Sequence, residues 1–229
     1  MTTTSERFDA AHPRQSTLAE RLAHVRWIAG GTGAGKSTVA DRLGELFDVA
    51  VVHGDPAEPG WIARSGPEHP NLFALSRLPP GSFWAGRTAK QAYRATPSVH
   101  GETLAHLVQD LLALPADRRI LVDYFGVLPR HVAPLLSRPG QAVFLLPTAE
   151  WRHGVMLGRH GPVVDEILAK RLVRDGMWDA RVRKQAHRLG MPVISVDGTR
   201  SGAATAAEVA EHLDLGPAHG PRDSGHGGH

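Results

Sequence analysis

Residues 30–37 read GGTGAGKS, which fits the pattern G-x-x-x-x-G-K-[ST]. A short, mostly apolar segment (24–29) precedes this stretch, and residues 36–47 follow it with apolar side chains at helical spacing. Glycines let backbone N–H groups converge on an anion, and the start of the next helix favours negative charge. We therefore predict an α/β fold in which this loop joins a strand to a helix and binds phosphate.

The loop predicts a nucleoside triphosphate site, with ATP and Mg²⁺ as its ligands. We expect the ammonium group of Lys36 to reach the β- and γ-phosphates and the hydroxyl of Ser37 to bind Mg²⁺. The residues expected to contact the nucleotide are Gly31, Thr32, Gly33, Ala34, Gly35, Lys36, Ser37 and Thr38.

Two aspartates end apolar segments that read as strands. Asp123 ends the segment 119–123 and is predicted to be the second protein ligand of Mg²⁺, directly or through water. The alternative is an aspartate that only caps a helix or a turn. Asp197 directly follows the apolar segment 192–196, and we predict a turn residue there, beside a base-binding loop at residues 198–201.

The remaining pattern alternates strands with helices, which is typical of a mainly parallel sheet covered by helices on both faces. Further strands are expected at 48–53 and 141–146, and residues 61–99 read as irregular, rich in Pro, Gly and Trp. We expect a flexible arm at 1–15, one domain at 16–215 and a disordered tail at 216–229. The other helices are predicted at 16–23, 101–114, 128–137, 148–157, 162–188 and 206–213.

Composition narrows the classes of partner. The 229 residues include no cysteine, which excludes disulfides, thiolate zinc sites and cysteine nucleophiles. No run of 18 apolar residues and no secretory leader is recognisable, so we expect a cytoplasmic protein without a membrane span. The 26 basic residues are dispersed, which argues against nucleic acid as the main partner. His219, His226 and His229 read as solvated rather than metal-binding residues.

The order of these elements resembles the small-molecule and nucleotide kinases of the P-loop class, a group that includes nucleoside monophosphate kinases, gluconate and shikimate kinases and chloramphenicol phosphotransferase. The stretches LLPTAEWR and RLVRDGMWDARVRKQAHRLGMPVISVDG also resemble ATP-binding proteins common in actinobacteria. The motifs N-K-x-D of GTPases and L-S-G-G-Q of ABC transporters are absent from the sequence. The resemblance implies a P-loop NTPase three-layer sandwich with a five-stranded sheet and a helical lid at 148–188.

The resemblance also implies roles for charged residues outside the loop. Asp55 follows the second strand, where such kinases carry an acid that orients or deprotonates an acceptor hydroxyl, and Glu58 is a second candidate. An Asp-Pro turn without chemistry is the alternative for Asp55. In the lid, we expect Arg171 and Arg174 to act on the transferring phosphoryl group and Arg159 to bind the nucleotide. Arg152 is a further lid candidate.

The acceptor is expected to lie between the loop and residues 55–115. Trp61, Arg64, Phe83 and Trp84 are candidates for lining its pocket. A nucleotide acceptor would need an arginine such as Arg64, Arg77 or Arg87 for its phosphate, whereas an uncharged alcohol would need Asp55. We predict an ATP- and Mg²⁺-dependent phosphotransferase acting on a small molecule. The alternative is a nucleotide-binding regulator or slow ATPase, and the sequence predicts no oligomeric state.

Overall fold

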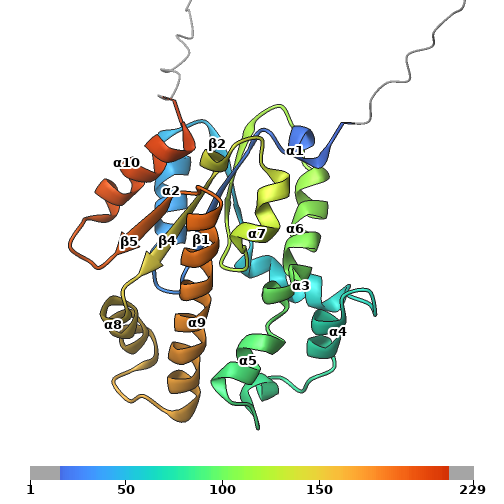
Figure 1. Cartoon of the computed structure of the whole chain (residues 1–229), viewed down its shortest axis with the longest axis vertical. Coiled ribbons are helices and arrows are strands. Elements are labelled where there is room, and N and C mark those ends of the chain that lie inside the picture. The colour runs from blue at the N-terminus through green and yellow to red at the C-terminus, as the bar shows by residue number, and fades with distance from the viewer. Residues whose placement is uncertain (1–15, 217–229) are drawn as a thin grey trace, which may run out of the picture.

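A computed structural model describes residues 16–216 of the chain. The arm predicted at 1–15, the tail beyond residue 216 and its three histidines lie outside the described residues. The sheet has five parallel strands in the order β2-β3-β1-β4-β5 (Figure 1). Their bounds are β1 Val25–Gly30, β2 Val49–His53, β3 Arg119–Asp123, β4 Ala142–Pro147 and β5 Val193–Val196. The predicted α/β fold is confirmed, and each strand begins and ends within about two residues of its expected position.

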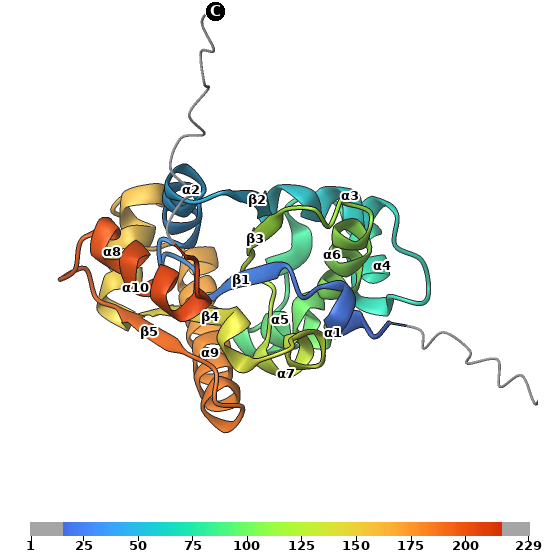
Figure 2. The ribbon, with the colours of Figure 1, turned by 90° about the horizontal axis from the view of Figure 1, so that it is seen from above.

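The strand order places β1 in the centre of the sheet, between β3 and β4 (Figure 2). From β1 the chain passes to β2 and β3 on one side and then crosses to β4 and β5 on the other. This reversal makes the carboxyl end of β1 a topological switch point, where ligands of open α/β sheets bind. The register brings Ile28 of β1 opposite Asp123 of β3, and His53 of β2 opposite the same aspartate. Residues that follow β1, β2 and β3 consequently meet at one edge of the sheet.

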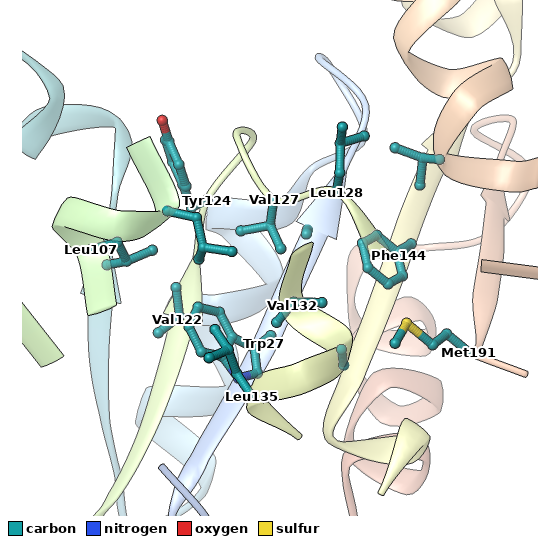
Figure 3. Close-up of a cluster of buried hydrophobic side chains, with 14 of the residues drawn as sticks. Trp27, Leu107, Val122, Tyr124, Val127, Leu128, Val132, Leu135, Phe144 and Met191 are labelled. Atoms are coloured by element: carbon teal, nitrogen blue, oxygen red, sulfur yellow. The ribbon is translucent and has the colours of Figure 1, made fainter. Parts of the chain in front are cut away.

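Helices cover both faces of the sheet. On one face, α2 (Lys36–Leu46) and α10 (Gly202–Leu213) pack Val39, Leu43 and Val209 onto buried strand residues. On the other face lie α6 (Glu102–Leu112), α7 (Pro129–Val132) and α9 (Glu166–Arg188). Figure 3 shows Trp27 and Phe144 among the apolar side chains of this second core, with the Tyr124 hydroxyl turned away from the cluster. These three layers are the predicted sandwich.

The segment predicted to be irregular, 61–99, contains short helices, so that prediction is wrong. They are α3 (Glu58–Ala63), α4 (Pro70–Ser76) and α5 (Ala89–Ala95), with 3₁₀ turns at Asp55–Ala57, Ser82–Trp84 and Pro97–His100. Proline occupies a first-turn position in α3 and α4, where its missing N–H costs nothing. Thr88 and Gln91 form a capping box that starts α5. The prolines therefore start these helices instead of marking loops.

Two helices follow β4 in the predicted lid region. The first, α8, spans Ala149–His160 and ends three residues later than expected. The second, α9, begins only at Glu166, after Asp165 caps the Leu168 N–H at 2.7 Å. The carboxyl-terminal half of α9 packs Trp178, Val182 and Ala186 into the core. Figure 1 shows that α8 and the other half of α9 extend beyond the sheet, at the end where α4 and α5 lie.

The other elements are short or close to their predicted bounds. A Thr17–Glu20 capping box begins α1 (Leu18–Arg21), and Ser201 starts α10 four residues before the predicted position by accepting from the Ala204 N–H. Two further 3₁₀ turns span Ala133–Leu135 and Pro139–Gln141. Within residues 16–216, none of the helices has the length and apolar character that crossing a membrane requires.

Candidate active site

The loop between β1 and α2 is held tightly against β4. Gly30 has φ +126°, and a Cβ atom there would lie 2.0 Å from the carbonyl oxygen of Leu145. The N–H of Gly31 donates to that same oxygen at 2.8 Å. Gly35, at φ +75°, turns the chain into α2 from the left-handed region that favours glycine. The loop therefore keeps its shape through backbone contacts that larger residues would prevent.

Lys36 begins α2 and folds back over the loop. Its side chain is buried, and Nζ donates to the Gly31 carbonyl oxygen at 3.0 Å. Burial lowers the pKa of Lys36, while the charges of Asp123 and Asp55 act in the opposite direction. An ammonium group is thus present at the start of a helix, where a polyphosphate would also meet the helix dipole.

Asp123 is buried at the end of β3, and a histidine orients it. Its Oδ2 lies 3.0 Å from Nδ1 of His53, whose Nε2 lies 3.0 Å from Oδ1 of Asp41. Burial lowers the pKa of His53, but the hydrogen bonds and charges of the two aspartates outweigh it, so this pKa lies above its ordinary value. Sequence reasoning missed His53. The sequence does show that His53 ends a predicted strand. Only the strand order, which pairs β2 with β3, shows that His53 lies beside Asp123.

A cavity of about 600 Å³ opens beside the loop, within the usual size range of small-molecule sites. The loop side of its lining consists of six predicted nucleotide-contact residues: Thr32, Gly33, Gly35, Lys36, Ser37 and Thr38. Of the other predicted site residues, Gly31, Ala34 and Asp123 do not line it, and all three are buried.

Two carboxylates line the same cavity. Asp55 follows β2 in a 3₁₀ turn, and burial raises its pKa although Lys36 acts to lower it. Glu58 begins α3, and its Oε1 accepts a hydrogen bond from the Tyr124 hydroxyl. Burial also raises the pKa of Glu58, against the effect of the Tyr124 hydrogen bond. Asp55, the candidate base, and Glu58, its alternative, therefore line the same cavity. The charge of Lys36 acts on Asp55, whereas Glu58 is hydrogen-bonded to Tyr124.

The far side of the cavity is mostly apolar and comes from the short helices and turns after β2 and from the end of β3. Phe83 and Trp84 line it, as expected, but Trp61 does not. Trp61 is in the core, where its Nε1 donates to Asp110 at 2.6 Å and its ring meets Tyr124 edge-on. The lining on this side is Ile62, Leu72, Leu75, Phe83, Trp84, Thr96, Pro97, Ser98, Thr103 and Phe125.

Three of the four candidate lid arginines reach the cavity. Arg159 comes from α8, and Arg171 and Arg174 come from one face of α9. The Arg174 guanidinium lies over the Trp84 and Phe125 rings, 5.5 and 5.3 Å from their centroids. Burial lowers the pKa of Arg174, opposed by the charge of Asp175. The Nε–Oδ1 separation in this pair is 2.7 Å, although the N–H is not aligned for a hydrogen bond.

Arg152 is absent from the cavity lining and has a different partner. Its Nη1 forms a buried ion pair with Oδ2 of Asp179, a residue of α9. A Cβ atom on Gly31 would lie 2.6 Å from Oδ1 of Asp179, so this pair lies directly behind the phosphate loop. Burial raises the pKa of Asp179 to about 6 despite Arg152. Asp179 is a second residue that local sequence reasoning missed.

The candidate acceptor-side arginines also have other partners. Arg64 pairs with Asp110, Arg77 lies 5.2 Å from the ring centroid of Phe73, and Arg87 lies 5.2 Å from that of Phe83. None of the three arginines lines the cavity as the described residues define it.

A smaller cavity of about 140 Å³ adjoins the other side of the loop. Trp151 covers it and donates from Nε1 to the Gly33 carbonyl oxygen at 3.2 Å. Gly198 approaches the Trp151 ring so closely that a Cβ would lie 2.2 Å from Cζ3. Asp197 forms the predicted turn, accepting from the Thr199 N–H at 2.9 Å. The lining comprises Gly33, Ala34, Gly35, Thr38, Val39, Trp151, Val196, Gly198, Arg200, Gly202 and Thr205.

Comparison with known proteins gives similarity at the level of overall structure. No protein-family model matches the chain, and no curated protein matches its sequence. A tunicamycin resistance protein from Deinococcus radiodurans is 16% identical, covering 86% of this chain and 98% of that one, with a TM-score of 0.47. A gluconokinase from Sinorhizobium meliloti 1021 is also 16% identical, with coverages of 84% and 91% and a TM-score of 0.42. A sugar kinase from Janibacter sp. HTCC2649 is 15% identical, with coverages of 85% and 96% and a TM-score of 0.44.

Proposed function

We propose that this protein transfers the γ-phosphoryl group of ATP, with Mg²⁺, to a small-molecule acceptor. One observation carries the proposal: Lys36 and Ser37 of the phosphate loop and the carboxylate of Asp55 line a single cavity. A phosphate donor on the loop and an acceptor beside Asp55 would then share one cavity. Phosphoryl transfer depends mainly on such positioning and on electrostatic stabilisation.

The nucleotide side has groups suited to each part of ATP. Backbone N–H groups of residues 31–37 and the Lys36 ammonium suit the phosphates, and the slot beside Trp151 and Gly198 suits a flat base. The Ser37 hydroxyl and the Asp123 carboxylate are the proposed protein ligands of Mg²⁺, an ion that prefers oxygen and takes few protein ligands. Bound Mg²⁺ would neutralise charge on the phosphates.

The chemistry on the acceptor side involves Asp55. The acceptor hydroxyl oxygen forms a bond to the γ-phosphorus as its proton passes to the Asp55 carboxylate. The bond between the γ-phosphorus and the β–γ bridging oxygen breaks, and ADP leaves with that electron pair. Lys36, Arg159, Arg171 and Arg174 are the proposed cations that stabilise the charge on the transferring group. An acceptor that is itself a phosphate would need no base.

Product analysis by mass spectrometry tests the proposal. Purified protein, ATP and Mg²⁺ are incubated with pooled nucleosides, nucleotides, sugars and amphipathic alcohols, and Lys36→Ala serves as the control. One acceptor that gains a phosphoryl group with the wild type, but not with the variant, supports a kinase. ATP binding without a phosphorylated product in any pool would instead favour a nucleotide-binding regulator or slow ATPase.

A further inference from the structure

The acceptor side of the cavity has a distinctive chemistry. Its apolar surface comes from aliphatic residues of α3 and α4 and from the rings of Phe83, Trp84 and Phe125. Its polar groups are two carboxylates, Asp55 and Glu58, and the hydroxyls of Thr96, Ser98 and Thr103. The described residues between β2 and β4 contribute no lysine or arginine to this lining.

Of the cations that line the cavity, Arg174 is the one whose guanidinium lies over aromatic rings of this apolar surface. It comes from α9, and its guanidinium lies over the Trp84 and Phe125 rings while Nε pairs with Asp175. In the proposed reaction, Arg174 also serves the transferring phosphoryl group. An anionic acceptor would therefore compete with that group for Arg174 and would face the charges of Asp55 and Glu58. Like charges brought together in one binding site repel each other.

Glu58 adds a second requirement for the acceptor. Oε1 accepts from the Tyr124 hydroxyl, which fixes the carboxylate in the cavity lining. Because a carboxylate accepts several hydrogen bonds, Glu58 can take a further donor from a ligand. Beyond Tyr124, the Ser98 hydroxyl lies 2.9 Å from that of Thr103, and both line the cavity. The site therefore offers one carboxylate to a reacting hydroxyl and another to a second donor.

Resting on the proposed phosphotransferase function, we infer that the acceptor is an uncharged hydroxyl compound with an apolar, ring-sized face and a second O–H or N–H group for Glu58. The apolar face packs on Phe83 and Trp84, the reacting hydroxyl meets Asp55, and the second donor meets Glu58. Nucleoside monophosphates and sugar acids are excluded as preferred acceptors, because each brings an anion to the side of the cavity that is formed between β2 and β4, where the charged residues are the carboxylates Asp55 and Glu58.

Matched pairs of acceptors test this inference. Each pair differs in one anionic group: a nucleoside and its 5′-monophosphate, a hexose and its aldonic acid, an aromatic diol and its carboxylate analogue. Transfer from ATP is followed by product mass and initial rate. We expect the uncharged member with an aromatic face to be preferred about tenfold or more in kcat/KM, since like-charge contacts disfavour its partner. Preference for the anionic members would overturn the inference while leaving the phosphotransferase function intact.

The variant Glu58→Gln tests whether Glu58 recognises the acceptor or only holds Tyr124 in place. Glutamine retains an oxygen that can accept from Tyr124 but removes the charge. We expect KM for the uncharged acceptor to rise about tenfold, with a smaller change in kcat, and the discrimination against anions to shrink. Glu45→Gln, on the exposed surface of α2, is the matched control and should change neither value. Unchanged KM and unchanged discrimination in Glu58→Gln would contradict the role given to Glu58.

If no acceptor is phosphorylated, binding measurements test the inferred acceptor chemistry separately from the phosphotransferase function. Saturation-transfer NMR with the same pairs, in the presence of ATP and Mg²⁺, reports contact without turnover, and Trp84→Ala tests the ring face. Binding of uncharged aromatic alcohols that depends on Trp84, without transfer, would contradict the phosphotransferase function but support this binding chemistry. Binding of the anions alone, or of no uncharged member, would overturn the inference.

Discussion

The imidazole of His53 lies between two carboxylates, with Nδ1 3.0 Å from Oδ2 of Asp123 and Nε2 3.0 Å from Oδ1 of Asp41. Asp123 is buried, whereas the Asp41 side chain is 62% exposed. The histidine therefore connects the proposed Mg²⁺ ligand to the surface and fixes which carboxylate oxygen remains for the metal. Groups that orient a metal ligand in this way commonly affect metal affinity.

His53→Ala should weaken the response to Mg²⁺. Removing the imidazole frees the Asp123 carboxylate to rotate, so we expect the Mg²⁺ concentration needed for half-maximal ATP binding or turnover to rise about 10- to 100-fold. Titration calorimetry of ATP at several Mg²⁺ concentrations measures this change. Asp41→Asn, which alters only the outer partner, should have a much smaller effect. Equal effects of both variants would argue against orientation of Asp123 as the cause.

Trp151→Phe should weaken ATP binding without loss of fold. The ring would still cover the small cavity, but the hydrogen bond from Nε1 to the Gly33 carbonyl would be lost. A net hydrogen-bond contribution of about 0.5–1.5 kcal/mol corresponds to a Kd increase of about 2- to 12-fold. Trp84→Phe, on the acceptor side, is the matched control for nucleotide titrations. A normal Kd for Trp151→Phe would show that the hydrogen bond to Gly33 does not contribute to ATP binding.

Local patterns were sufficient to predict the sheet and the glycine-rich loop that joins β1 to α2. The motif at residues 30–37 needs only its own glycines and its flanking strand and helix, and the other strands appear as short apolar runs ending at turn residues. Asp55 and Asp123 could be proposed because both follow such strands. The short helices between 58 and 95 were missed because each has fewer than eight residues, too few to show helical periodicity.

Contacts between distant segments could not be predicted in the same way. Arg152 looked like its neighbours in the lid, but its partner, Asp179, is 27 residues away on another helix. No local pattern distinguishes an arginine buried against an aspartate from one that faces a ligand. Similarly, Trp61 and Trp84 are equally apolar in sequence, and only the packing of α3 against Tyr124 puts the first in the core.

The pH dependence of turnover should follow Asp55. As a base, Asp55 must be deprotonated, and burial raises its pKa above the ordinary value of 3.8. Activity should therefore fall as pH decreases through this raised pKa, at a higher pH than an exposed aspartate would give. Asp55→Asn should lower kcat about 10²- to 10⁴-fold and abolish this acidic limb. Near-normal turnover of Asp55→Asn with a hydroxyl acceptor would contradict the proposed role of Asp55 as proton acceptor.

Arg152→Met should destabilise the fold. The variant leaves the Asp179 carboxylate buried beside the phosphate loop without its partner, at an expected cost of about 3–5 kcal/mol in the free energy of unfolding. The pKa of Asp179 is already raised to about 6 and should rise further. At a pH above the folded-state pKa, the Asp179 carboxylate is charged and its burial destabilises the fold. As pH falls through that pKa, the carboxylate takes up a proton and the loss of stability becomes smaller. Urea unfolding should therefore show a smaller loss at pH 5 than at pH 8.

The matched control for this stability prediction is Arg200→Met. Arg200 also pairs with a carboxylate, Glu208, but its side chain is 44% exposed, so its loss should cost about 1 kcal/mol or less. Equal losses for the Arg152 and Arg200 variants, or a loss for Arg152→Met that does not change with pH, would contradict the buried-charge explanation.

Arg171→Ala and Arg174→Ala should affect the chemical step more than ATP binding. Both side chains line the cavity from the half of α9 that extends beyond the sheet. If they stabilise the transferring phosphoryl group, kcat should fall by up to about 10³- to 10⁵-fold, the effect of an arginine that contacts this group in known phosphoryl-transfer enzymes. Rapid-quench single turnovers measure the step directly. Arg183→Ala, at an exposed position further along α9, should behave as wild type. If kcat is unchanged while the Kd for ATP rises, the two arginines act in nucleotide binding, and their proposed role in stabilising the transferring phosphoryl group is wrong.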